Sequence, residues 1–483
     1  KVASGGIPKS PIFMATLWFH GIDSSGDTLI SVDMYHQGGS DFGQGAMPPG
    51  AGIGFQPKVD QVIYKVSRDD IDKGRIDPNQ LTNDIINWPA FYEYNGDTLP
   101  LAPFVDKNQD GKYNPELGDY PFVRGDQSLF FVYHDMVNHA ISQSKPLGLQ
   151  IQVEAYAFAT NDKLNDYVFV RYKIISQNQD LSHFRVGVMS DYDLGNYSDD
   201  FVGTDTSLNM TYVLNGDDDD EGILGYGLNP PAFATVFLNQ PLCGSCLNQN
   251  SWSGDFRIAN SYTDYRNLLY GLETDGDSMR VNTPSTPAGK NSRYHFTGNP
   301  VNAAGWNMEN DNRFVKGDYR MLGITGQDSL MRGDTFDLWL LFAYARGNSG
   351  GAKGSLAKLQ TDIDDIFLRY FDKPQIPADC FAPRINGDTS NPGVGILKPE
   401  IKAPLAQVFP NPANKQLQVE LNNQGNTVQY VLFGANGQKM LSGQETTDFS
   451  IDVEKLANGI YFLRIDELDS NRSESMRIVI HHE

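Results

Sequence analysis

The stretch Leu149-Gln-Ile151-Gln-Val153-Glu-Ala155 alternates apolar and polar residues, and residues 168–174 (VFVRYKI) repeat this alternation. Successive side chains of a strand point to opposite faces of its sheet, so a period of two predicts two strands, each with one buried face. Residues 160–163 between them suit a hairpin loop, which would make the strands antiparallel neighbours. We therefore expect a fold built from antiparallel sheets.

Further strand-like segments recur on both sides of this pair. They span residues 14–19, 29–35, 62–66, 129–133, 184–189 and 336–345. The last segment is dominated by apolar residues, which predicts a central strand covered on both faces. Residues 355–371 instead space their apolar side chains at helical intervals behind Ser355, and predict one amphipathic helix capped by that serine.

The composition excludes several classes of protein. The chain has 483 residues, of which 40% are hydrophobic, enough to form a sizeable core. Its net charge of −22 repels phosphate backbones, so we expect no nucleic-acid partner. The longest strictly apolar run, residues 338–345, is far shorter than the roughly 20 residues of a membrane-spanning helix, so we expect no membrane insertion.

A change of composition divides the chain into domains. Residues 382–403 are rich in proline and glycine without periodicity, and predict a linker between a large β-rich unit (1–381) and a small unit (404–483). The small unit has evenly spaced strand candidates and an Asn436-Gly437 turn, which favour a small β-sandwich. The expected fold class is all-β, with a large antiparallel β-sandwich and one amphipathic helix preceding the small sandwich.

The small unit also carries an ordered set of short motifs. They are Val408-Phe-Pro-Asn-Pro-Ala413, Ala435-Asn-Gly437, Ile451-Asp-Val453 and Leu456-Ala-Asn-Gly-Ile-Tyr-Phe-Leu463. In this order they resemble the type A C-terminal sorting domain of cargo exported by the bacterial type IX secretion system. The resemblance implies an immunoglobulin-like sandwich that the outer-membrane translocon recognises during export, and a secreted protein with an extracellular or cell-surface location.

Parts of the large unit, such as residues 18–23 and 155–161, resemble recurring stretches of uncharacterised large secreted proteins that carry the same sorting domain. That resemblance implies no activity.

One loop of the large unit has the spacing of a calcium site. Oxygen ligands recur at alternate positions, with Gly111 at the sharp turn. The expected ligands are Asp106, Asn108, Asp110, the carbonyl of Lys112, and Glu116 or Asp119. The alternative is an Asp/Asn/Gly turn that binds no ion.

A second acidic cluster follows a predicted strand. It comprises Asp191, Asp193, Asp199, Asp200 and Asp205. So many carboxylates in a short stretch favour a second bound cation, whereas a solvent-exposed loop is the alternative. For the acidic run at residues 217–221 we expect a solvated loop.

The cysteines, the histidines and a glycine-rich loop do not indicate a catalytic or metal site. The chain has three cysteines, Cys243, Cys246 and Cys380, so at most one disulfide forms, and the Cys-x-x-Cys pair in an expected polar loop indicates a structural bridge or idle thiols. Residues 347–351 (GNSGG) resemble a protease nucleophile loop in spelling alone, and His134 and His139 lack the spacing of a zinc helix. The carboxylate pair of a glycoside hydrolase is positioned by the fold and has no local sequence spacing, so a hydrolase stays an alternative.

These observations lead to one leading hypothesis. We expect a non-catalytic, calcium-stabilised, secreted surface protein with a structural, adhesive or filament-forming role. Exposed sheet edges would allow homo-oligomers or filaments, with a monomer as the alternative. The rival function is a secreted hydrolase or carbohydrate-binding protein that acts on extracellular polymers.

Overall fold

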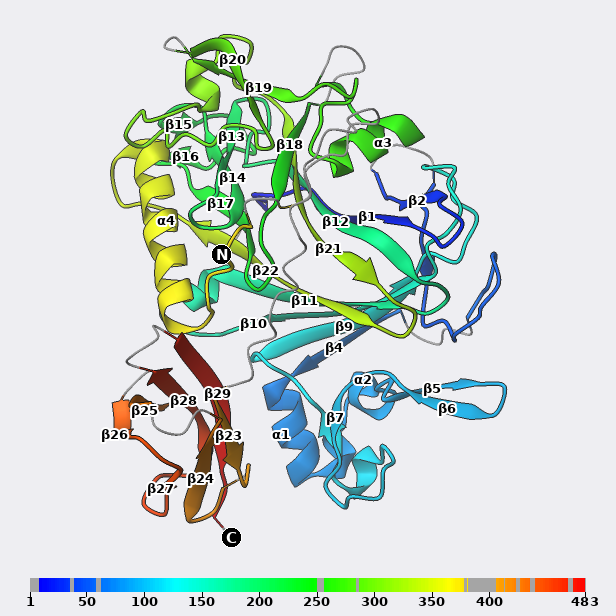
Figure 1. Cartoon of the computed structure of the whole chain (residues 1–483), viewed down its shortest axis with the longest axis vertical. Coiled ribbons are helices and arrows are strands. Elements are labelled where there is room, and N and C mark those ends of the chain that lie inside the picture. Colours follow the sequence, from blue (N-terminus) through cyan, green and yellow to red (C-terminus); the bar gives the residue numbers. More distant parts are fainter. Residues whose placement is uncertain are drawn as a thin grey trace. The chain divides into compact units, whose positions relative to one another are not determined.

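The chain forms two compact units in the computed structural model, Lys1–Arg384 and Ile385–Glu483 (Figure 1). The structure describes residues 8–34, 39–57, 62–249, 256–283, 286–377, 380, 405–411, 413–422, 426–434, 439–467 and 472–482. The predicted linker at residues 382–403 lies outside the described residues.

Two antiparallel sheets form the first unit. The five-stranded sheet has the order β18 (Gly244–Gln249), β21 (Tyr319–Leu330), β12 (Leu181–Tyr192), β1 (Met14–Ile22), β2 (Thr28–Ser31). The nine-stranded sheet has the order β13 (Asp200–Asp205), β14 (Met210–Asn215), β17 (Ala232–Phe237), β22 (Thr335–Ala345), β11 (Tyr167–Ser176), β10 (Leu149–Ala157), β9 (Gln127–His134), β3 (Gly43–Gln44), with β4 (Ile63–Ser67) also paired to β9. The expectation of an all-β fold is confirmed.

The two strands predicted from residues 149–155 and 168–174 are β10 and β11. They are antiparallel, with Val153 opposite Tyr172. Ile151 and Val153 pack in one core cluster with Phe19 and Val186 of the five-stranded sheet. The alternating pattern therefore marks the face of the nine-stranded sheet that packs against the five-stranded sheet.

Strand β22 is central, as expected, between β17 and β11. Leu338 and Leu340 belong to the core cluster between the sheets, whereas Leu341 and Ala343 belong to the cluster beneath helix α4 (Gly351–Arg369). Both faces of this strand are thus covered, which explains why nearly all of its residues are apolar.

Helix α4 is the predicted amphipathic helix, but Ser355 is not its cap. The helix begins a turn earlier, after Gly350 at φ 86°. Asp218 Oδ1 accepts the Ala352 N–H at 3.1 Å, and Asn229 Oδ1 accepts the Gly351 N–H at 3.0 Å. In the acidic run at 217–221, Asp217, Asp218 and Glu221 are exposed, as expected of a solvated loop, but Asp219–Asp220 form a short strand and Asp218 also caps this helix.

Three shorter helices were not predicted. They are α1 (Arg68–Ile76), α2 (Asn83–Ile86) and α3 (Tyr262–Leu269). In α1 only Ile71 and Gly74 are buried, so its apolar period is weak, and a Ser67–Asp70 capping box starts it. Short two-stranded ribbons complete the unit: β5 (Phe91–Tyr94) with β6 (Asp97–Pro100), β7 (Phe104–Val105) with β8 (Tyr120–Pro121), β15 (Asp219–Asp220) with β16 (Gly227–Leu228), and β19 (Met279–Thr283) with β20 (Thr286–Ser292).

A single disulfide joins Cys243 to Cys380, 137 residues apart. Cys246 is a buried free thiol on β18. The expected polar loop around the Cys-x-x-Cys pair is therefore wrong. The bridge fastens the segment that follows α4 to the five-stranded sheet.

The second unit is a small β-sandwich. Its three-stranded sheet has the order β23 (Ala406–Phe409), β24 (Gln416–Leu421), β27 (Phe449–Asp452), and its four-stranded sheet the order β26 (Lys439–Glu445), β25 (Val428–Gly434), β28 (Gly459–Glu467), β29 (Arg472–Ile480). One core contains Leu417, Val419, Leu432 and Leu463 from both sheets. The predicted Asn436-Gly437 turn lies outside the described residues.

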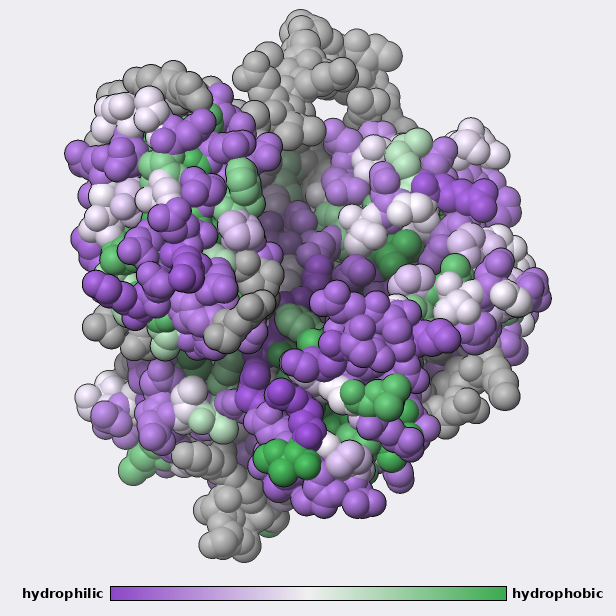
Figure 2. Space-filling model, turned by 90° about the horizontal axis from the view of Figure 1, so that it is seen from below, coloured by the Kyte–Doolittle hydropathy of each residue, from purple (hydrophilic) through white to green (hydrophobic). Residues whose placement is uncertain are grey.

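The surface is strongly hydrophilic on the face drawn in Figure 2. Purple, hydrophilic residues predominate there, and the hydrophobic residues that are coloured form separate small patches. The excess of 60 acidic over 38 basic residues makes the chain anionic as a whole.

Candidate metal centre

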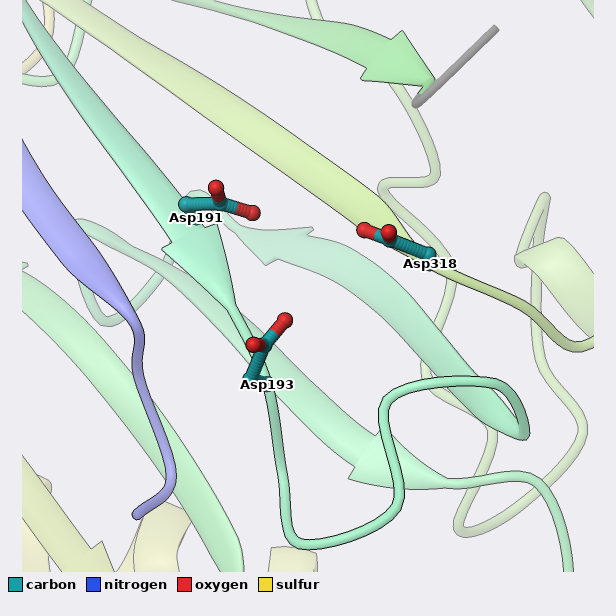
Figure 3. A group of neighbouring side chains, drawn as sticks. All are labelled: Asp191, Asp193 and Asp318. Atoms are coloured by element: carbon teal, nitrogen blue, oxygen red, sulfur yellow. The ribbon is translucent and has the colours of Figure 1, made fainter. Parts of the chain in front are cut away.

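Three aspartates meet at one end of the five-stranded sheet, where β12 ends and β21 begins. Tyr192 pairs with Tyr319 and Asp191 with Arg320 in the register of these strands. Asp193 follows β12 and Asp318 precedes β21, so the next position of this register places them opposite each other. Residues two apart share a face, which brings Asp191 to the same side as Asp193. Figure 3 shows the three carboxylates pointing toward one another.

The spacing of these carboxylates fits one cation. Asp191, Asp193 and Asp318 each offer an oxygen, and these oxygens lie within 4.8 Å of one another. Two oxygens that bind the same Ca²⁺ at about 2.4 Å can lie at most about 4.8 Å apart. We name these residues the Asp191–Asp193–Asp318 triad.

The charge of the triad also fits a divalent ion. Arg320 is the cation that faces it, with Nε 3.0 Å from Asp191 Oδ2 and Nη1 3.9 Å from an Asp318 oxygen. Three carboxylates and one guanidinium sum to −2. One Ca²⁺ or Mg²⁺ would neutralise this charge.

Burial makes the charged form of the triad costly without a cation. Asp191 is only 2% exposed, and among the described residues no group donates a hydrogen bond to its Oδ1. Burial raises the pKa of Asp191 to about 6, opposed by Arg320. Burial, with Asp191 and Asp318 beside it, raises the pKa of Asp193 to about 7. The site is therefore short of positive charge near neutral pH.

Asp200 of the predicted cluster lies near Asp193 of the triad, and Asp199 precedes it in the chain. Asp200, fully buried at the start of β13, accepts the Leu194 N–H at 3.0 Å through Oδ2, while its Oδ1 has no donor among the described residues. Burial raises the pKa of Asp200 well above its usual value, with Asp199, Asp220 and Asp193 adding to the effect. Burial also raises the pKa of Asp199 to about 6.

Asp205 does not join this cluster. It lies at the other end of β13 from Asp200. Its Oδ1 accepts the N–H groups of Ser207 and Leu208, and its Oδ2 accepts a hydrogen bond from Gln360 of α4. Its carboxylate stabilises a turn.

Asp318 was not predicted from the sequence. Only the register of β12 with β21 brings it close to Asp193.

The loop at residues 106–119 closes on itself through carboxylate-to-backbone hydrogen bonds. Asp106 accepts the N–H groups of Gln109 at 2.7 Å and Gly111 at 2.8 Å. Asp119, buried, accepts those of Lys107 and Asn114, both at 2.8 Å.

Two side chains of this loop remain to be placed. Asp110 accepts the Lys112 N–H and the amide of Asn108, whereas Glu116 is exposed on a single 3₁₀ turn, Pro115–Leu117. Asp119 is thus buried and bound to the backbone of the loop, whereas Glu116 is exposed. Among the described residues, the acids whose oxygens converge within 4.8 Å are those of the triad and not those of this loop.

The histidines and the glycine-rich loop considered in the sequence have structural roles in the fold. His134 and His139 are buried and hydrogen-bonded: His134 Nδ1 accepts the Met136 N–H, and His139 Nε2 lies 2.9 Å from the Asp135 carbonyl oxygen. Residues 347–350 lie in the loop that connects β22 to α4, as loop chemistry predicted, and Gly351 is the first residue of the helix. In the described part of the chain, every helix is too short or too polar to cross a membrane.

The comparisons with solved structures are distant. One matching protein is titled "Biofilm associated protein - BSP domain" and shares 10% identity over 67% of this chain and 62% of that chain, with a TM-score of 0.15. Another is PorZ, titled an essential bacterial surface component of the type-IX secretion system of Porphyromonas gingivalis, with 10% identity over 81% of this chain, 48% of that chain and a TM-score of 0.14. This chain thus spans less than two thirds of either protein. No curated protein matches it.

The family comparison concerns the second unit. Residues 407–481 match the family described as "Secretion system C-terminal sorting domain". The match covers all the strands of the second unit except the first residue of β23. The second unit is therefore a type IX secretion C-terminal sorting domain, and this domain marks the chain as a secreted or cell-surface protein.

Proposed function

We propose that the first unit is a non-catalytic, calcium-stabilised protein of the cell surface, with a structural, adhesive or filament-forming role. The observation that supports the proposal is the convergence of the Asp191–Asp193–Asp318 triad around a buried carboxylate oxygen without a hydrogen-bond donor. Oxygen ligands of this kind suit Ca²⁺, a hard cation.

A cation in the triad would act as a cross-link. It would join the end of β12, the chain that leads on to β13, and the start of β21. It would also remove the repulsion between Asp193 and the two neighbouring carboxylates that raises its pKa. Both effects stabilise the folded state, since the unfolded chain does not hold these three residues together.

The loop at residues 106–119 is proposed as a second calcium site. Its ligands would be Asp106, Asn108, Asp110, the Lys112 carbonyl and Asp119. During export, the sorting domain would bring the type IX translocon as a partner. Homomeric assembly through sheet edges also stays a prediction.

The test is a thermal unfolding experiment on the full chain with EGTA and then with excess Ca²⁺. Calcium at one hundred times its Kd should raise the free energy of unfolding by about 2.7 kcal/mol at each site. Asp193→Asn should lose the gain of the triad, and should be more stable than the wild type in EGTA, because it removes one of the repelling charges. Asp110→Ala should lose the gain of the loop.

The matched control is Asp328→Asn, which removes an exposed charge near the far end of β21 from Asp318. This variant should keep the full response to calcium. An unfolding temperature of the wild type that is the same in EGTA and in calcium would contradict the proposal, as would a full calcium response in Asp193→Asn.

A further inference from the structure

A cavity of about 380 Å³ lies on the outer face of the nine-stranded sheet, the face turned away from the five-stranded sheet. The register defines its floor as two rows of side chains that cross β9, β10, β11 and β22. One row is Phe130, Glu154, Arg171 and Trp339, and the other is Val132, Gln152, Lys173 and Asp337. Five of these residues line the cavity itself, namely Phe130, Gln152, Glu154, Arg171 and Lys173, and we name the two rows together the floor.

The middle of the floor lies between two covered parts of the same face. Phe130 and Val132 pack under the segment of α1 and α2, in the cluster that contains Ile71 and Ile85. Tyr156 and Phe169, one step further along β10 and β11, pack in the cluster beneath α4. Between these two covers the sheet carries charged side chains, which is unusual for a strand face enclosed on either side.

Part of the charge on the floor is already paired. Arg171 binds Asp337 with two hydrogen bonds of 2.8 and 3.0 Å, and Arg124 binds Glu154 Oε2 at 2.9 Å. Both guanidinium groups also lie 5.1 Å from the ring centre of Trp339, which holds them in place.

Three polar side chains at the cavity have hydrogen-bonding groups that no described residue pairs. Glu154 is 8% exposed, and no described residue donates a hydrogen bond to its Oε1. Gln152 is 6% exposed, and its amide makes no hydrogen bond within the described residues. Lys173, half-buried, likewise has no ion pair or hydrogen bond there, because Arg171 takes up the carboxylate of Asp337 opposite it. Buried polar atoms are normally paired, so Glu154 Oε1 points to a missing ligand, and Gln152 and Lys173 beside it offer that ligand further polar contacts.

The walls of the cavity are apolar. They are formed by Phe91, Phe104 and Phe122 with Pro100 and Pro103. The rings of Phe91 and Phe104 meet edge to face at 5.6 Å, which fixes their orientation. The volume lies in the range of pockets that bind small ligands, roughly 300 to 1,000 Å³.

We propose that this cavity binds a sugar that carries a carboxylate, such as a uronic acid residue of an extracellular polysaccharide. Lys173 would pair with the carboxylate, Glu154 Oε1 would accept a hydrogen bond from a hydroxyl, and the Gln152 amide would bond a second hydroxyl. The C–H faces of the ring would pack against the Phe and Pro walls.

Charge favours an acidic sugar over a neutral one. Arg124, Arg171 and Lys173 outnumber Glu154 and Asp337 by one positive charge. This excess lies in a chain whose net charge is −22, so the cavity is a local exception. The sorting domain marks the protein as secreted or cell-surface, so the cavity would meet extracellular ligands. The proposal is independent of calcium binding at the triad.

The experiment is saturation-transfer NMR on the full chain with D-glucuronate and D-galacturonate, compared with D-glucose and D-galactose. We expect the uronates to bind and the neutral sugars to bind at least tenfold more weakly, since a charge-assisted hydrogen bond contributes about a factor of ten or more. Lys173→Gln should reduce uronate affinity about tenfold. Lys65→Gln, which removes an exposed lysine of β4 from the opposite face of the same sheet, should not change it.

Glu154→Gln provides a second variant, which should weaken uronates and neutral sugars alike, and the unfolding temperatures of all variants serve as the folding control. Absence of uronate binding to the wild type would overturn the proposal. Equal uronate affinity in Lys173→Gln would do so too. Tighter binding of triglutamate than of either uronate would assign the cavity to acidic peptides instead and would equally overturn it.

Discussion

Two buried histidines, His134 and His295, are each held in the neutral form by a hydrogen bond that the ring accepts. His295 Nδ1 accepts the Leu247 N–H at 3.1 Å, and His134 Nδ1 accepts the Met136 N–H at 3.1 Å. A ring nitrogen that accepts a hydrogen bond cannot carry a proton, so both imidazoles are neutral. Burial lowers the pKa of His295 to about 3, with Arg313 adding to the effect, and the pKa of His134 to about 4.

These histidines predict acid sensitivity of the first unit. In the unfolded chain each would have a pKa of about 6.5 and would bind a proton that the folded state excludes. Their contribution is therefore complete above pH 6.5 and is lost as the pH falls, by about 1.4 kcal/mol per pH unit for each histidine. His295→Asn keeps an acceptor near Leu247 and should flatten the fall of the free energy of unfolding by about that slope between pH 6 and pH 4.

The check is chemical denaturation at several pH values, with His481→Asn, an exposed histidine of the second unit, as the control. Carboxylates such as Asp193 have raised pKa values and change stability in the opposite direction, but they act equally in wild type and variant. An unchanged pH slope in His295→Asn would show that this imidazole is not excluded from protonation by the fold.

At the scale of elements, the interior of helix α4 was predictable from the sequence, whereas its first turn was not. The apolar spacing of Leu356, Leu359 and Ile363 identified α4, because these residues face one core cluster. Its first turn is instead capped by Asp218 and Asn229, more than one hundred residues earlier in the chain. No local pattern contains such a contact. The same holds for Asp318, which the register of two strands brings to Asp193.

The segment after α4 offers a test at this scale. The bond between Cys243 and Cys380 closes a loop of 137 residues, and a cross-link of that span restricts the unfolded chain by roughly 3–5 kcal/mol. Cys380→Ser should lower the free energy of unfolding by about this amount, as measured by denaturation without reductant. Cys246→Ser alters a free, buried thiol and should leave the response to reductant intact. Equal stability of wild type with and without reductant would contradict the expectation.

At the scale of the whole molecule, the two units carry different kinds of information. The sorting domain was predictable because its motifs are local and ordered along residues 408–463. The function of the first unit was not, since its polar clusters are assembled across strands. In the sequence, Glu154 and Lys173 occupy ordinary polar positions of two alternating strands. Only the pairing of β9, β10, β11 and β22 places them side by side in the floor of the cavity.

Export provides the prediction at this scale. Deletion of residues 404–483 should leave the chain in the periplasm, because the sorting domain addresses it to the secretion system. The first unit should remain folded, since among the described residues its strands pair only with other strands of the first unit. Cell fractionation and the unfolding temperature of the truncated protein measure the two results. Fusion of residues 404–483 to a periplasmic reporter is the control and should carry it to the surface, whereas surface display of the truncated chain would refute the prediction.

The disulfide has a mechanical consequence. A pulling force applied from the C-terminal side would enter the first unit through Cys380, because this residue is cross-linked to Cys243. From there the covalent bond transmits the load to Cys243, at the start of β18, and thus into the five-stranded sheet. The segment between α4 and Cys380 would then carry little of the tension. Helix α4 would then be shielded from being peeled off the sheet from its C-terminal end, and resistance to shear would rest on the hydrogen bonds between β18 and β21.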